Sequence, residues 1–334
     1  MSHDERGLRC QPKRNKNSLN NDTVVNTARP HRALYLGSWF IVAYTVVIIL
    51  WGAWVRLSGS GDGCGDHWPL CNGEVVPLEH PKKTWIEYSH RISTAIYGIL
   101  VFAQILLARR AFPKKHPARW WAVMTLVFTI TEALIGRQLV KSGLVNESAD
   151  LARLVVMPLH LINTSLLLLS GVMTAESIKH SSAARRALTP LERKVGVSYL
   201  IGLAIVLITG AIAALGSHLL PSESLLSGLS HDLASESHLA VRLRILHPLL
   251  ALTIPVGLLL FARLSPPEPQ SLRAFWYKRF TIILCAALLI GVATLSLLAP
   301  VWLKLTHLLM TNVVVIAFSA CVFHARYSTT GRSQ

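Results

Sequence analysis

Eight long apolar stretches dominate this sequence, and each is long enough to cross a lipid bilayer as a helix, which takes about 20 residues. Charged residues make up only 15% of the chain, against roughly 25% in a typical soluble domain. Backbone in lipid must satisfy its own hydrogen bonds, and the strict alternation of a membrane barrel is absent, so helices are expected. We predict an all-α polytopic membrane protein with spans at 33–54, 85–107, 120–140, 154–175, 195–215, 243–262, 280–301 and 302–323. The last two spans are joined so closely through Pro300 that they are expected to form a hairpin.

The positive charges predict which way the spans face. The formal net charge is +16, yet most Lys and Arg residues lie in the N-terminal tail, in the loops after the second, fourth and sixth spans, and in the C-terminal tail. The positive-inside rule makes this face cytoplasmic, with both termini inside. Residues 1–32 are expected to form a disordered cytoplasmic tail, and a nucleic-acid partner is not expected because the charges follow topology. We therefore predict a multi-pass protein of the cytoplasmic membrane.

Two of the five cysteines, Cys64 and Cys71, lie in the predicted outer loop. An oxidising exterior permits a disulfide between them. The pair is either a staple for the loop or, given its closeness and an exposed setting, redox-active. Cys10, Cys285 and Cys321 are expected to be unpaired.

Four histidines lie inside predicted spans at matching depth, near the outer ends of alternate helices: His90, His160, His247 and His307. An intramembrane histidine is a functional candidate by default, although one alone can be a packing residue. Four in this arrangement indicate metal ligation. Two histidines on facing helices of a four-helix bundle are a usual way to hold haem iron, whereas zinc normally takes three or four protein ligands. We predict one haem between His90 and His160 and another between His247 and His307.

The odd-numbered spans carry glycines near the same ends: Gly52, Gly136, Gly210 and Gly291. The separation from each glycine to the next of the four histidines alternates between long and short, which suggests a duplicated four-helix unit. We predict two pseudo-twofold four-helix bundles, comprising residues 33–176 and 195–324. The glycines would let helices or a flat cofactor approach closely, although ordinary helix packing also explains each one.

The two predicted haem sites differ in charge. Three residues before the four histidines, on the same helix face, stand Glu87, Met157, Arg244 and Lys304. Only Glu87 offers a carboxylate, which can act as a general base or stabilise a developing cation. The alternative for Glu87 is an ion pair with Arg91, four residues on.

Cations near the histidines are candidates to hold haem propionates: Arg56, Arg91, Arg244 and Lys304. For Arg56 and Arg91 the alternative is a role in topology alone. Glu132, in the middle of the third span, is expected to be an internal ion pair with Arg137 or a hydrogen-bonded neutral acid, with a chemical role as a further alternative.

Three motifs together resemble the haem A synthase family. Residues 51–64 read WGAWVRLSGSGDGC, residues 68–73 read WPLCNG, and residues 86–91 read IEYSHR. The resemblance covers all eight spans and is weaker in the second half. It implies an oxidoreductase that converts haem O to haem A by oxidising the C8 methyl, through a hydroxymethyl stage, to a formyl group. A loop after the fifth span, at 218–241, lacks the second cysteine pair that some members carry, which puts electron relay through that loop in doubt.

The same resemblance implies a role for each site residue. The N-terminal half would bind the substrate haem O through His90 and His160, with Glu87 as the catalytic residue. The C-terminal half would hold a haem b cofactor through His247 and His307. The Cys64–Cys71 pair would be structural or redox-active. The expected partners are haem O, membrane lipid, haem O synthase and an electron acceptor, in the service of cytochrome oxidase assembly; a homo-oligomer is allowed.

Three other functions remain open from the residues alone. A bis-haem b cytochrome would carry electrons without modifying haem. A transporter built from repeats would use the histidines in a proton relay and bind no haem. An oxidase assembly factor would have no catalytic activity.

Overall fold

The computed structural model describes residues 28–145 and 150–328. Within these residues, eight helical spans are long and apolar enough to cross a membrane, which confirms the prediction of an all-α multi-pass membrane protein. Seven of the spans are single helices: α1 (Ala28–Leu57), α2 (Lys82–Ala111), α3 (Pro117–Lys141), α4 (Arg153–Lys179), α5 (Pro190–Leu219), α9 (Leu272–Ser296) and α10 (Val301–Arg326). The sixth span consists of α7 (Leu239–Leu243) and α8 (Leu246–Ala262).

Several helix boundaries differ from the prediction; for example, α9 runs from Leu272 to Ser296, where a span at 280–301 was expected. Helix α1 begins at Ala28, so residues 28–32, assigned to the tail, belong to the first helix. Residues 1–27 of the predicted tail, and with them Cys10, lie outside the described residues. Sequence analysis also missed a short helix in the loop after α5, α6 (Leu225–Leu233), and a two-residue antiparallel pairing of β1 (Ala184–Arg185) with β2 (Tyr327–Ser328).

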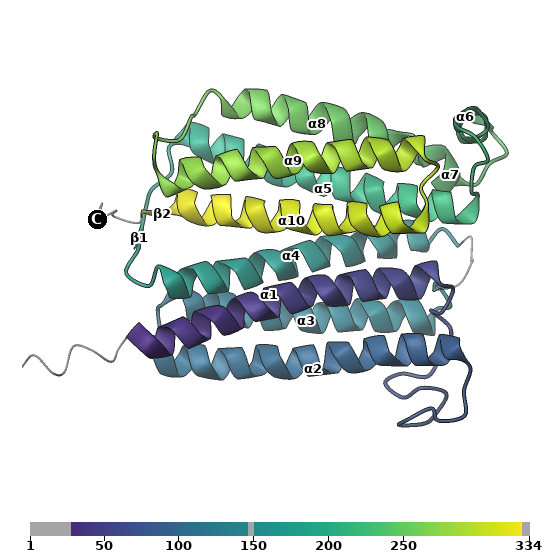
Figure 1. Cartoon of the computed structure of the whole chain (residues 1–334), viewed down its shortest axis with the longest axis horizontal. Coiled ribbons are helices and arrows are strands. Elements are labelled where there is room, and N and C mark those ends of the chain that lie inside the picture. Colours follow the sequence, from purple (N-terminus) through teal and green to yellow (C-terminus); the bar gives the residue numbers. More distant parts are fainter. Residues whose placement is uncertain (1–27, 146–149, 329–334) are drawn as a thin grey trace, which may run out of the picture.

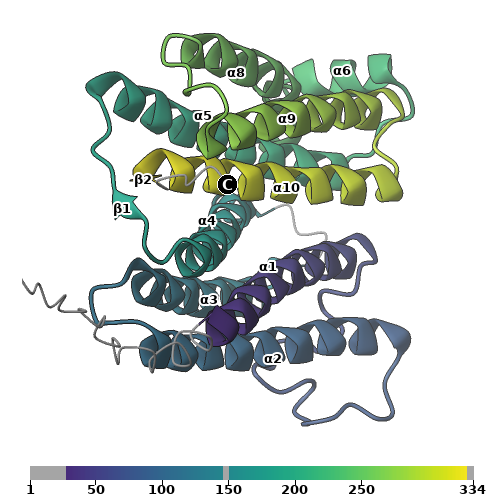
Figure 2. The same ribbon diagram turned by 60° about the vertical axis from the view of Figure 1, so that its left-hand side comes forward.

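The helices pack as two neighbouring groups (Figures 1 and 2). In the first, α1 packs on α2 and α4, and α3 packs on α2 and α4. In the second, α5 packs on α8, α8 on α9, and α9 on α10, which forms the predicted hairpin. Helices α4 and α10 lie side by side and join the groups, with further contacts of α4 to α5 and of α1 to α10. The predicted division into two pseudo-twofold four-helix bundles, residues 33–176 and 195–324, stays a prediction.

The join between the groups is a small apolar core. Val42 of α1, Val172 of α4 and Val315 of α10 are each at most 2% exposed and belong to one cluster. Outside this seam many large apolar side chains face outward, including Ile99 and Leu289 at 69% and 72% exposure. A soluble protein rarely exposes contiguous apolar surface on this scale, so this surface faces lipid.

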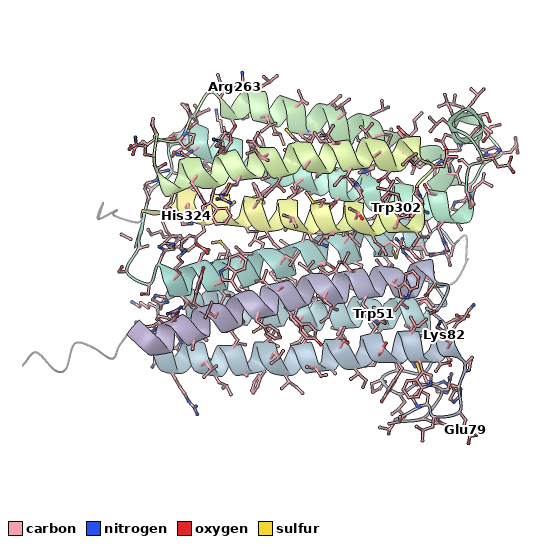
Figure 3. All side chains as sticks on the ribbon, viewed as in Figure 1. Trp51, Glu79, Lys82, Arg263, Trp302 and His324 are labelled. Atoms are coloured by element: carbon pink, nitrogen blue, oxygen red, sulfur yellow. A yellow bond between two sulfur atoms is a disulfide. The ribbon has the colours of Figure 1, made fainter. Side chains whose placement is uncertain are left out.

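The two ends of the helix bundle carry different loops and termini. The start of α1 and the last described residues lie at the same end, together with the loops that follow α2, α4 and α8 (Figure 1). We call this the termini end. The long loop between α1 and α2 and the helix α6 lie at the other end, which we call the loop end. Trp51, Lys82 and Trp302 lie toward the loop end, whereas Arg263 and His324 lie toward the termini end (Figure 3).

Candidate functional site

Glu87, in the second turn of α2, is buried at the loop end and held on both carboxylate oxygens. Its Oε1 accepts hydrogen bonds from Nη2 and Nε of Arg91, at 2.6 and 3.1 Å. Its Oε2 accepts from the backbone N–H of Cys64, at 2.9 Å. The same arginine donates through Nη1 to the carbonyls of His67 and Leu70, both at 2.7 Å. The predicted Glu87–Arg91 ion pair therefore exists. It also ties the loop between α1 and α2, residues 58–81, to α2; we call this loop the cysteine loop.

Cys64 and Cys71 form a disulfide. Their exposed fractions are 0% and 1%, so the exposed setting that favoured a redox-active pair is wrong. Because thiol exchange requires access to a sulfur atom, this burial supports the loop-staple interpretation. The loop docks closely on α2: a Cβ at Gly63 would lie 2.6 Å from the carbonyl oxygen of Lys83, so only glycine fits there.

We expect the Cys64→Ser/Cys71→Ser double variant to lose part of the activity proposed below. A disulfide typically stabilises a folded structure by about 2–4 kcal/mol. Without it, the Cys64 N–H no longer holds the Glu87 carboxylate firmly. Haem extraction should show haem A lowered several-fold, with the haem b content of the second group unchanged. Complete loss of haem A in a well-folded double variant would contradict the staple role and favour redox cycling.

Three of the four intramembrane histidines pack against a glycine on the preceding long helix. A Cβ built on each of these glycines would lie 3.0–3.1 Å from the Cε1 atom of the facing ring. The glycines therefore make room for the imidazoles, a sharper role than general helix packing. The pairs are Gly52 with His90, Gly210 with His247, and Gly291 with His307.

His160 follows a different arrangement. Among the residues that the structure describes, no atom lies within 4 Å of a Cβ built at Gly136, the glycine predicted to match it. The ring meets a carboxylate of α3 instead: Nδ1 of His160 lies 3.3 Å from Oε1 of Glu132. Asn163 donates to Oε2 of Glu132 at 2.6 Å, and Thr164 donates to Oε1. Carboxylates that pair with a ligand histidine typically fix its ring orientation.

The expected ion pair between Glu132 and Arg137 is wrong. The guanidinium of Arg137 lies over the ring of Trp68 in the cysteine loop, 5.9 Å from its centroid. Residues five apart on a helix point in different directions, and Glu132 points inward to α4. The alternative of a hydrogen-bonded acid describes Glu132 better.

The rings of the second pair of histidines are spaced as two imidazoles that would hold one iron ion. The ring centroids of His247 and His307 are 6.3 Å apart. Imidazole nitrogen binds a first-row metal ion at about 2 Å, so two rings on opposite sides of one ion have centroids about 6 Å apart. Among the described residues, the buried Nδ1 of His307 makes no hydrogen bond, whereas Nδ1 of His247 lies 3.4 Å from Oγ1 of Thr209.

The first pair, His90 and His160, also contains a buried ring nitrogen without a hydrogen-bond partner among the described residues. Nδ1 of His90 is buried and makes no hydrogen bond to any residue that the structure describes, whereas Nδ1 of His160 faces the Glu132 carboxylate at 3.3 Å. Buried polar atoms normally have partners, so packing alone does not explain the ring of His90, and the spacing of His247 and His307 fits one haem iron.

Gly210→Ala should weaken haem b binding by the second pair. The new methyl would lie 3.0 Å from Cε1 of His247, so the ring must move. We expect a clear fall in haem b per protein, measured by pyridine haemochrome. Gly257→Ala on α8 is the matched control, because nothing lies within 4 Å of its Cβ position. Equal haem content in both variants would show that the Gly210 contact does not position the ring.

The predicted propionate partners divide into two groups. Arg56 interacts electrostatically with Lys304 and with Arg153, a buried residue at the start of α4 that sequence analysis did not single out. These three cations come from α1, α4 and α10, the helices that meet at the seam. A cluster of positive charge there suits anionic groups.

Arg244 has partners other than those predicted. Its guanidinium donates to Asp232, to Oγ of Ser222 at 3.0 Å, and to the carbonyls of Leu220 and Gly228 at 2.8 and 3.0 Å. With these bonds it anchors α6 and its loop onto the bundle. Arg91 is likewise engaged by Glu87 and the cysteine loop.

Comparison with known proteins identifies the family of this chain. The family model described as COX15-CtaA, cytochrome oxidase assembly protein, matches residues 36–319. The chain belongs to this family. The match covers all eight membrane helices and confirms the resemblance to the haem A synthase family.

The matches of this COX15-CtaA chain to individual relatives each cover part of the relative's length. A protein of Thermus thermophilus named protoheme IX farnesyltransferase is 37% identical over 285 residues, which cover 84% of this chain and 46% of the relative. A heme A synthase of Exiguobacterium sibiricum is 30% identical over 181 residues, 54% of this chain and 59% of the relative. Another, of Shouchella clausii, is 32% identical over 160 residues, 48% and 50%. The chain thus spans about half the length of the curated relatives it matches.

Proposed function

We propose that this protein is a haem A synthase, which oxidises the C8 methyl of haem O through a hydroxymethyl intermediate to the formyl group of haem A. The observation that carries the proposal is a buried carboxylate, Glu87, fixed on α2 three residues before His90. Family membership and the relatives named heme A synthase support the same activity.

In this proposal the substrate haem O binds between His90 of α2 and His160 of α4. Glu132 orients the ring of His160, because their atoms approach to 3.3 Å. The cations Arg56 and Lys304, at the loop end of α1 and α10, receive propionates. Arg91 acts chiefly by holding Glu87, since its hydrogen bonds go to that carboxylate and to the loop.

Glu87 is placed to accept a proton. A carboxylate offers roughly four lone-pair positions, and Arg91 and the Cys64 N–H occupy three with their hydrogen bonds. One position on Oε2 is left for a substrate proton. Oxidation of the hydroxymethyl to the formyl releases two electrons and two protons, and we assign one of these protons to Glu87.

A haem b bound by His247 and His307 would supply one-electron redox chemistry beside the substrate half. The chain's own contribution there is to hold two imidazoles 6.3 Å apart against Gly210 and Gly291. The electrons then pass to an acceptor outside this chain.

We further propose a place in the cytoplasmic membrane with both termini cytoplasmic, because the termini end gathers the cationic loops. Haem O would come from a haem O synthase. The Thermus relative supports such a neighbour, since it is named for protohaem farnesyl transfer and this chain matches 46% of it.

The test is to produce the protein in cells that supply haem O and to extract the haems. We expect haem A in the extract and a b-type haem in the purified protein. Two b-type haems without haem A would indicate an electron-carrying cytochrome. No haem absorbance at all would favour a transporter. A protein that binds haem, together with haem A still formed in cells that lack this protein, would favour an assembly factor.

A further inference from the structure

A second cluster of potential ligands lies at the termini end, far along the helices from the four histidines. Glu176 lies in the last turn of α4, His180 directly follows that helix, and His324 lies in the last turn of α10. Oε2 of Glu176 lies 3.2 Å from Nε2 of His324 and 3.5 Å from Nε2 of His180. Figure 3 shows His324 at the opposite end of α10 from Trp302. Neither the four-histidine arrangement nor the proposed reaction uses these residues.

Burial makes this cluster unusual. The side chains of Glu176 and His324 are 3% and 2% exposed, and that of His180 is 17% exposed. Although Nε2 of His324 approaches Glu176, neither nitrogen of this ring makes a hydrogen bond of normal geometry to any residue that the structure describes. Trp276 of α9 stacks on the ring, at 6.2 Å between centroids and 11° between planes. A buried imidazole without well-formed hydrogen bonds calls for another partner.

We propose that Glu176, His180 and His324 form a binding site for a divalent transition-metal ion, of which Zn²⁺ is the best match. One ligand atom from each residue lies within 4.8 Å of the others. Ligands at about 2.0–2.1 Å in a zinc tetrahedron are about 3.3 Å apart, close to the two distances from the carboxylate oxygen. Two imidazoles and one carboxylate form a known zinc ligand set that leaves a fourth position for water. Ca²⁺ and Mg²⁺ prefer sets of oxygen ligands, so they fit poorly.

The location of the site gives it a structural consequence. Two ligands come from the end of α4 and one from α10, so a bound ion joins the first helix group to the second. The same end is already tied by the β1–β2 pairing and by Arg186, whose N–H donates to the carbonyl of Arg326 at 2.8 Å. A metal ion there would clamp the termini end and leave the haem ligands at the loop end untouched.

The experiment uses the full chain purified with its haem, so that haem iron occupies the four intramembrane histidines. After chelator treatment and desalting, Zn²⁺ is titrated against a competing indicator, and bound zinc is counted by mass spectrometry. We expect one Zn²⁺ per chain and a higher Tm in its presence. Zinc K-edge X-ray absorption should report two imidazole ligands.

Three variants locate the site. Glu176→Gln keeps the shape of the side chain, and His180→Ala changes the most exposed ligand, so both are expected to fold. Each should weaken Zn²⁺ binding at least tenfold and remove the zinc-dependent rise in Tm. His116→Asn is the control, because His116 lies at the same end outside the cluster and Asn keeps its helix-capping ability. Zinc bound equally by the control and both cluster variants, or no zinc bound by the wild type, would overturn the proposal.

Discussion

Glu87→Gln is expected to lower haem A formation by about 10²–10⁴-fold, the usual contribution of a general base. The amide keeps the size of the side chain, and its oxygen can still accept from the Cys64 N–H, but it can no longer take a proton. Haem A and unreacted haem O are measured in extracts by chromatography. Glu79→Gln is the matched control, because Glu79 is an exposed carboxylate of the same cysteine loop.

A loss of activity must be separated from a loss of folding. In the variant, Arg91, whose side chain is 13% exposed, loses its charge partner, and breaking a buried pair costs up to about 3–5 kcal/mol. Haem b bound by the second helix group serves as the folding readout, because His247 and His307 do not contact this pair. A Glu87→Gln variant with normal haem b and undiminished haem A would remove Glu87 from the mechanism.

His247→Ala and His307→Ala are each expected to reduce haem b in the purified protein to near zero. Each variant removes one of the two proposed iron ligands, and the glycine that faces the missing ring, Gly210 or Gly291, has no side chain to replace it. Reduced-minus-oxidised spectra and haem per protein measure the effect. His231→Ala on α6 is the control, since it changes a histidine outside the spans.

Added imidazole sharpens this second prediction. A small free ligand can enter the space left by the missing ring and restore an axial bond to iron. Partial recovery of the haem b spectrum in His247→Ala, with none in the control, would assign the loss to ligation. Full haem b content in either variant would show that His247 and His307 are not the haem b ligands.

The sequence predicted the helices well because a bilayer imposes a length and a composition that can be read along one dimension. The motif that contains Glu87 and His90 was equally readable, since residues three apart share one face of a helix. The boundary errors, such as the start of α1 at Ala28, arose because helix ends depend on local capping and packing.

The partners of side chains were predicted less well, because they depend on which helices become neighbours. For Glu132 the sequence left open an ion pair with Arg137 or a hydrogen-bonded acid, and the structure shows it turned to α4, where it meets His160. Arg244 was predicted as a partner for a haem propionate, but its guanidinium pairs with Asp232 of α6. Burial of the cysteine pair likewise depended on how the loop docks on α2.

The sequence by itself determined that this chain crosses a membrane eight times and carries four histidines at one depth. These properties follow from the local chemistry of single segments. Only the tertiary structure decided that three of these rings rest on glycines, and that Glu176 and His180 at the end of α4 meet His324 of α10. The reason is physical: contacts between residues about 150 positions apart depend on the lateral packing of helices, which the apolar pattern of each helix leaves open.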